Sequence, residues 1–204
     1  MNVGVLVSGS GTNLQALLDS QARGELSPAA IAVVISSKPG AGALARAIAA
    51  GVPAIVVDHR SLDRAAFDEE LAAVLAAHRC EAVVLAGFMR VLTPGFVDRF
   101  PMRIVNTHPS LLPAFPGIAA PAQAIAHGVK LSGVTVHFVD ASLDGGPIID
   151  QVAVRVEPGD DAAALHARIQ REEHQLLPRV VRRLAAGELS CQGRIVTHVG
   201  GRAE

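Results

Sequence analysis

The sequence predicts an α/β fold in which a doubly wound, mostly parallel, Rossmann-like sheet is followed by an antiparallel C-terminal strand pair and a long C-terminal helix. Through the first half of the chain, short Val/Ile-rich runs alternate with longer helical patterns, and this alternation is typical of a parallel sheet. The alternation then gives way to two longer apolar runs that lie close enough in sequence to pair antiparallel. A chain of 204 residues that is 50% hydrophobic fits one compact domain.

The first predicted strand, residues 2–7, is a continuous apolar run, as expected for a strand covered on both faces. The other predicted strands of this half are residues 31–36, 54–57, 82–86 and 103–106. The predicted helices between them are residues 12–20, 42–50, 62–78 and 94–100. Leu14, Leu17 and Leu18 form one stripe of the first helix, and Gly51 ends the second. Pro94 lies in a first helical turn, where proline is tolerated.

The second half begins with predicted strands at residues 134–140 and 148–156, joined by a glycine-rich loop. Residues 161–186 form a long amphipathic pattern, which we expect to be a helix interrupted or bent near Pro178. The segment around Gly193 is a candidate for a small hairpin.

Composition excludes several classes of function. The formal net charge of −1 is not that of a nucleic-acid binder, and no apolar run is long enough to span a bilayer. The N-terminal MNVGVLVSG reads as a strand rather than a signal peptide, so we expect a cytoplasmic enzyme. Cys80 and Cys191 lack metal-ligand spacing and are expected to be free thiols, and the histidines show no metal-binding pattern.

The segment SGSGTN directly follows the first strand and opens the first helix. Small residues there let backbone N–H groups approach an anion at a helix N-terminus, and Ser10, Thr12 and Asn13 could add side-chain donors. The P-loop lysine is absent, and Leu14 occupies the third glycine position of a dinucleotide fingerprint. We therefore favour a monophosphate over a pyrophosphate, with a tight turn and helix cap as the alternative.

Asn106 and His108 lie at the end of the fifth predicted strand, where open α/β sheets bind ligands. Their spacing of two projects both side chains to one side, and an amide beside an imidazole suits a developing oxyanion. Asp144, on the later glycine-rich turn, could orient His108 and relay a proton, although an ordinary Asp-Gly turn is the alternative. His137 is either a supporting hydrogen-bonding residue or a core histidine.

Two further segments have both structural and functional interpretations. Residues 85–92 follow a strand and could wall a flat aromatic ligand, or simply pack a helix entry on the core. Glu173 lies in a charged cluster of the late helix, which either is a solvated face or binds a substrate ammonium.

Together these segments resemble the phosphoribosylglycinamide formyltransferase family over nearly the whole chain. The resemblance is carried by VLVSGSGTN, VVLAGFMRVL, NTHPSLLPAFPG, GVTVHFVDASLDGGPII and EEH. It implies the formyltransferase fold and transfer of a formyl group from 10-formyltetrahydrofolate to the amine of glycinamide ribonucleotide in de novo purine (IMP) biosynthesis. The implied partners are these two small molecules, with no metal, nucleic acid or membrane, and the implied state is a monomer or homodimer.

The resemblance also implies roles for matching residues. Asn106, His108 and Asp144 match the catalytic trio that stabilises the tetrahedral intermediate, with His137 in support. The implied ribonucleotide-binding residues are Gly11, Thr12, Asn13 and Glu173. The implied folate-binding residues are Arg64, Met89, Arg90, Val91, Leu92 and Asp140. Residues 1–204 would form a single formyltransferase domain, with residues 1–107 as its nucleotide- and phosphate-binding half and residues 108–204 as its folate-binding and catalytic half.

The family also suggests a cis Leu112–Pro113 peptide bond. One stretch departs from the family pattern: residues 118–122 read IAAPA, and Ala119 stands where a histidine is often found. Two other activities remain open: a formyltetrahydrofolate deformylase, which uses a similar trio with water as the acceptor, and a non-catalytic nucleotide-binding sensor.

Overall fold

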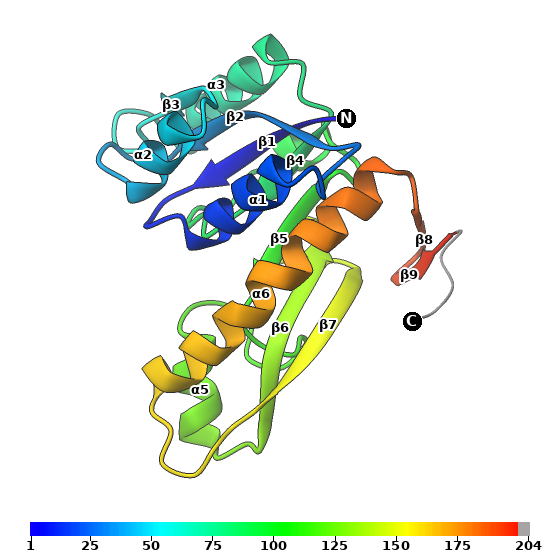
Figure 1. Cartoon of the computed structure of the whole chain (residues 1–204). Coiled ribbons are helices and arrows are strands. Elements are labelled where there is room, and N and C mark those ends of the chain that lie inside the picture. Colours follow the sequence, from blue (N-terminus) through cyan, green and yellow to red (C-terminus); the bar gives the residue numbers. More distant parts are fainter. Residues whose placement is uncertain (200–204) are drawn as a thin grey trace.

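The computed structural model describes residues 1–199 and contains a seven-stranded sheet and a separate two-stranded hairpin (Figure 1). The strands of the large sheet are β1 (Asn2–Val7), β2 (Ala30–Ser36), β3 (Ala54–Val56), β4 (Ala82–Leu85), β5 (Ile104–His108), β6 (Leu131–Phe138) and β7 (Ile148–Arg155). The hairpin consists of β8 (Leu189–Gln192) and β9 (Ile195–His198). The helices are α1 (Thr12–Ala22), α2 (Gly42–Ala49), α3 (Arg64–Ala77), α4 (Pro94–Val97), α5 (Ala120–His127) and α6 (Ala162–Ala185).

The order of strands across the large sheet is β3-β2-β1-β4-β5-β6-β7. Pairing is parallel from β3 through β5 and antiparallel for β5–β6 and β6–β7. This confirms the predicted fold class. The carboxyl ends of β1, β4 and β5 lie next to one another, so the loops that follow these strands share one edge of the sheet.

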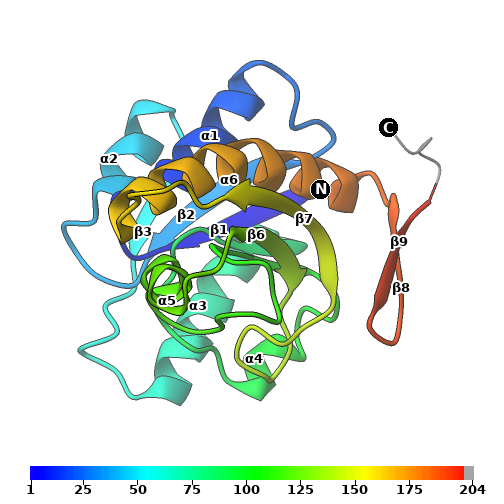
Figure 2. The ribbon, with the colours of Figure 1, turned by 90° about the horizontal axis from the view of Figure 1, so that it is seen from below.

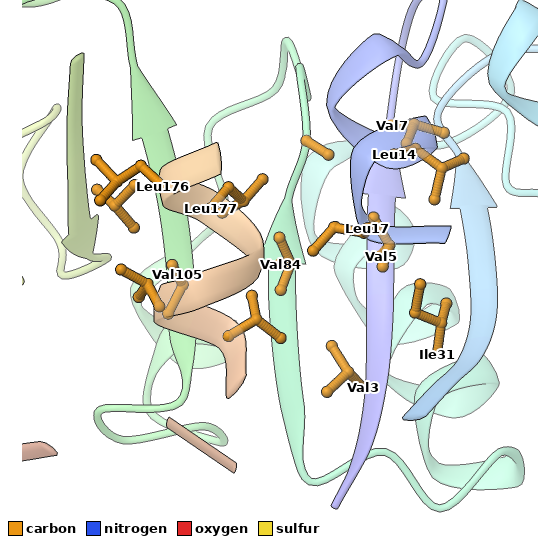
Figure 3. Packing of buried hydrophobic residues seen from close by; sticks show 14 of the residues in the cluster. Val3, Val5, Val7, Leu14, Leu17, Ile31, Val84, Val105, Leu176 and Leu177 are labelled. Carbon is orange, nitrogen blue, oxygen red and sulfur yellow. The ribbon is translucent and has the colours of Figure 1, made fainter. Parts of the chain in front are cut away.

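Helices cover both faces of the sheet (Figure 2). One face packs against α1, α2 and α6, and the buried side chains on it include Val5, Leu17 and Leu176, which belong to the cluster drawn in Figure 3. On the opposite face, α3 and α4 contribute Phe67 and Phe96 to a second cluster. Alternate residues of β1 enter the two clusters, as the pleat of a strand requires.

Local capping explains where several helices begin. The side chains of Asp63 and Asp161 accept hydrogen bonds from backbone N–H groups in the first turns of α3 and α6. Thr93 caps α4 in the same way, immediately before Pro94. Gly11 precedes α1, so no side chain caps the first turn of this helix.

Three sequence expectations differ from the structure. No helix was expected between residues 107 and 134, where α5 lies, and β6 begins at Leu131 rather than at residue 134. Of the two expectations for Pro178, the interruption is wrong, because α6 continues through this residue, and the bend stays a prediction. Proline removes one helical hydrogen bond, and burial of the surrounding apolar side chains of α6 offsets that loss. The hairpin around Gly193 and the cis Leu112–Pro113 bond are confirmed.

Candidate active site

Asn106 and His108 lie near the carboxyl end of β5, and β6 pairs antiparallel with this strand. The register pairs Asn106 with His137 and His108 with Thr135. The amide Nδ2 of Asn106 lies 3.2 Å from Nε2 of His137. An amide and two imidazoles from neighbouring strands therefore gather at one end of the sheet, as the spacing of the motif predicts.

Asp144 reaches this group from the loop between β6 and β7. One carboxylate oxygen, Oδ2, lies 3.5 Å from Nδ1 of His108, and the other lies 3.9 Å from Nε2 of His137. The backbone N–H of Gly117 donates to Oδ2 at 2.8 Å, which anchors the carboxylate to the loop ahead of α5. The structure thus brings Asp144 together with Asn106 and His108, from which it is distant in the sequence, and adds His137, which contacts both Asn106 and Asp144.

The hydrogen bonds of His137 assign its proton. Its Nδ1 lies 2.8 Å from the carbonyl of Phe138, which can only accept, so Nδ1 carries the hydrogen. Nε2 is then free to accept from the amide of Asn106. Burial lowers the pKa of His137, which is only 2% exposed, and this favours the neutral ring. A neutral His137 can hold the Asn106 amide in place without adding charge beside Asp144.

His108 has a different environment. Its Nε2 lies 2.8 Å from the carbonyl oxygen of Phe115, and its Nδ1 faces Asp144. Both ring nitrogens are beside oxygens that act as acceptors, so a protonated ring can donate from either one. The buried His108 therefore has an oxygen beside each ring nitrogen, and the oxygen facing Nδ1 belongs to a carboxylate.

The loop that follows His108 is braced by a network that the sequence analysis missed. Thr135 Oγ1 donates to the carbonyl of Ser110 at 2.7 Å and accepts from the N–H of Leu112 at 3.0 Å. Gln151 Nε2 also bonds Thr135 Oγ1 and the carbonyl of Leu112. Thr135 stands two residues before His137 on the same strand, so strand alternation could have placed it on the same face.

The predicted phosphate loop is shaped by close packing against α2. Gly11 has φ 78°, and a Cβ at this position would lie 2.7 Å from the Cα of Ala43. Gly11 precedes α1 without a side-chain cap, so the N–H groups of the first helical turn are not capped by it. Thr12 Oγ1 accepts from Gln170 Nε2 of α6 at 2.9 Å. This helix N-terminus has the form of an anion site.

Glu173 of α6 is buried rather than part of a solvated face, since it is only 4% exposed. Thr107 Oγ1 donates to its Oε1 at 3.1 Å, and the side chain of Asn13 lies near enough to favour the charged carboxylate. Burial raises the pKa of Glu173, whereas these two side chains lower it. Glu173 therefore lies between the phosphate loop and β5. The sequence analysis missed Thr107, which bonds Glu173, and Gln170, which bonds Thr12.

The predicted folate-binding segment follows β4. Met89 and Val91 are 73% and 60% exposed, and the N–H of Met89 donates to Ser8 Oγ at 3.0 Å. Arg64 donates to the carbonyls of Val91 at 3.0 Å and Leu92 at 2.8 Å, so it shapes this segment from α3. Leu92 itself is buried, and Arg90 is exposed. Exposed apolar side chains on a braced loop suit a flat apolar ligand.

Asp140 lies in the loop that carries Asp144. Its Oδ1 accepts hydrogen bonds from both the N–H and the hydroxyl of Ser142, which closes the start of this loop. The departing segment at residues 118–122 lies at the start of α5. Ala119 has φ 57° and precedes the helix without a side-chain cap, and Ile118 is 85% exposed.

Residues 1–199 hold neither a cluster of metal-ligating side chains nor a helix fit to span a membrane. Among residues 1–199, no cluster of at least three His, Cys, Asp or Glu side chains could hold a metal ion. No helix within this range combines the length and the apolar character needed to cross a bilayer. Both cysteines in this range are free.

Comparison with known proteins identifies the family. The family model described as formyl transferase matches residues 1–181. The chain belongs to the formyl transferase family. It is 45% identical to a phosphoribosylglycinamide formyltransferase of Mycobacterium tuberculosis, a match that covers 95% of this chain and 89% of that protein.

Two further proteins have sequence identities to this chain in the same range. The chain is 47% identical to the trifunctional purine biosynthetic protein adenosine-3 of Drosophila melanogaster over 91% of its own length, but it spans only 14% of that protein. The crystal structure of glycinamide ribonucleotide transformylase 1 from Symbiobacterium toebii matches with a TM-score of 0.95 and 49% identity, covering 98% of this chain and 94% of that one.

Proposed function

We propose that this formyl transferase moves the formyl group of 10-formyltetrahydrofolate to the amine of glycinamide ribonucleotide, a step of de novo purine synthesis. The observation that carries the proposal is the meeting of Asn106, His108 and Asp144 beside a glycine-opened helix N-terminus suited to a phosphate. The names of the relatives support the same reaction.

In the proposed reaction, the neutral amine attacks the formyl carbon and forms a new C–N bond. The resulting oxyanion accepts hydrogen bonds from the Asn106 amide and from His108, which exchanges its bond to the Phe115 carbonyl for one to the oxyanion. The bond between the formyl carbon and N10 of the folate then breaks. The proton lost by the amine reaches N10 by way of His108, Asp144 or water.

The protein contributes mainly by position and charge. Two bound substrates react in one complex, which removes much of the entropic cost of their encounter. Asp144 holds His108 and balances its positive charge at 3.5 Å. Burial of both imidazoles keeps bulk water from competing for these hydrogen bonds.

The resemblance to the family supplies the proposed binding residues. We propose that Gly11, Thr12, Asn13 and Glu173 hold the ribonucleotide, and that Arg64, Met89, Arg90, Val91, Leu92 and Asp140 form the folate pocket. Residues 1–107 then form the phosphate-binding half of a single domain and residues 108–204 its catalytic and folate-binding half. Asn106, Arg64 and the folate segment 89–92 reach across from the first half, and Glu173 reaches across from the second. We also propose a cytoplasmic enzyme acting as a monomer or homodimer.

An assay that follows loss of formylfolate, with and without glycinamide ribonucleotide, tests the proposal. We expect consumption only when both substrates are present, with formylated ribonucleotide as the product. Release of formate without ribonucleotide would instead indicate a deformylase. Unchanged formylfolate after prolonged incubation with the ribonucleotide would indicate a non-catalytic nucleotide-binding protein.

A further inference from the structure

Thr107 lies between Asn106 and His108 in sequence but faces the opposite side of the sheet. Successive residues of a strand alternate between faces, so Thr107 points toward the helices that include α6. Its Oγ1 lies 3.1 Å from Oε1 of Glu173 on that helix. Both residues are buried, with Thr107 9% and Glu173 4% exposed.

A threonine hydroxyl in this position has a defined task. A buried carboxylate is shielded from water, and burial destabilises its charged form. Hydrogen-bond donors from the protein offset this effect. The Thr107 hydroxyl donates to Glu173, and this hydrogen bond and the neighbouring Asn13 side chain lower the pKa of Glu173 against the effect of burial. Thr107 therefore fixes the orientation of the Glu173 carboxylate and favours its charged form.

The orientation matters because Asn13 belongs to the proposed phosphate loop. A phosphate held by the N–H groups of the first turn of α1 carries its sugar beside Asn13, and sugar hydroxyls or an ammonium donate readily to a carboxylate. Asn13 Oδ1 is also buried and has no hydrogen-bond partner within the described residues, so it is an acceptor that a ligand donor can satisfy.

We infer that Thr107 is a positioning residue for the ribonucleotide, which acts by holding the Glu173 carboxylate toward the phosphate loop. The inference rests on the proposed function, since the ribonucleotide is the ligand that the loop and the carboxylate would share. Thr107 itself takes no part in formyl transfer, because its hydroxyl is committed to the face of the sheet opposite His108.

Thr107→Val keeps the branched shape and removes the hydroxyl, and Thr107→Ser keeps the hydroxyl. Thr107→Val should raise the KM for glycinamide ribonucleotide about tenfold, because it removes a hydrogen bond to a charged group. The KM for formylfolate should stay at the wild-type value, and Thr107→Ser should restore ribonucleotide binding. Ser132→Ala is the matched control, because Ser132 is a buried hydroxyl on β6 without a hydrogen-bond partner in the described chain.

A double-mutant cycle separates this role from simple packing. If Thr107 acts through the carboxylate, Thr107→Val should have no further effect on ribonucleotide binding in a Glu173→Met background. Additive effects of the two substitutions would overturn the inference. So would a Thr107→Val variant with an unchanged ribonucleotide KM, or one in which both KM values rise alike.

Calorimetric titration of glycinamide ribonucleotide in the absence of folate distinguishes failure of this inference from failure of the proposed function. Wild-type binding that weakens in Thr107→Val and recovers in Thr107→Ser supports the positioning role even if formyl transfer is not observed. Equal binding by the wild type and Thr107→Val, alongside normal wild-type transfer, refutes the positioning role alone. Absence of any binding by the wild type refutes both. Melting temperatures of all variants confirm that each is folded.

Discussion

Replacement of Asn106 by alanine should damage catalysis and stability by two separable routes. The substitution removes an amide donor from the proposed oxyanion site, and a donor of this kind is typically worth about 10²–10³ in kcat. It also removes the hydrogen-bond partner of His137 Nε2, 3.2 Å away in a side chain that is 2% exposed. An unpaired buried polar atom costs about 1–3 kcal/mol of folding free energy. Each kcal/mol lowers the melting temperature of a domain of this size by about 2–4 °C.

The two routes are measured on the same protein samples. Initial rates at saturating concentrations of both substrates give kcat, and thermal melts give the loss of stability. Asn2→Ala is the matched control, because Asn2 is an asparagine of β1 whose amide bonds the carbonyl of His78 away from the site. An Asn106→Ala variant with wild-type kcat would refute the oxyanion role. A loss of kcat no greater than its unfolded fraction would refute it as well.

Three further predictions concern other parts of the chain. Gly11→Ala should lower the melting temperature and raise the ribonucleotide KM, because its Cβ would collide with the backbone of α2 and a left-handed residue costs about 1–2 kcal/mol. Gly95→Ala, outside the proposed site and with open space around its Cβ, should do neither. Burial lowers the pKa of His137, so the unfolded chain binds a proton there more tightly than the folded protein does. The free energy of unfolding should therefore fall as the pH drops below 6.5, the pKa of the unfolded histidine. The same dependence of this free energy on acid pH in His137→Gln would contradict the prediction. Burial raises the pKa of Cys80 to about 11, so mass spectrometry at pH 8 should find a thiol reagent on Cys191 well before Cys80, and equal labelling would be contrary to this expectation.

Much of the sheet could be predicted because its strands are marked by local patterns. The continuous apolar run of β1 is buried on both faces, and the two longer runs after His108 pair antiparallel as β6 and β7. The helix α5 was missed because it has only eight residues and its buried side chains are the small Ala120, Pro121 and Ala124, which leave no marked apolar pattern. Its position depends on packing against α6, which a local pattern does not reveal.

The candidate site was partly predictable for similar reasons. Asn106 and His108 are close in sequence, and strand alternation alone places them side by side. The resemblance to a family supplied the match of Asp144 and Glu173, whose positions depend on the tertiary fold. The partners of Glu173 could not be predicted, because Thr107 and Asn13 meet it only after β5, α1 and α6 have packed together.

The most direct test of the central claim compares formyl transfer by the wild type and by His108→Ala, with the formylated ribonucleotide quantified by mass spectrometry. We predict that the wild type forms one product molecule for each formylfolate consumed, and that His108→Ala remains folded but transfers at least about 10²-fold more slowly. Equal transfer rates for the two proteins, or consumption of formylfolate with formate as the only product, would contradict the account.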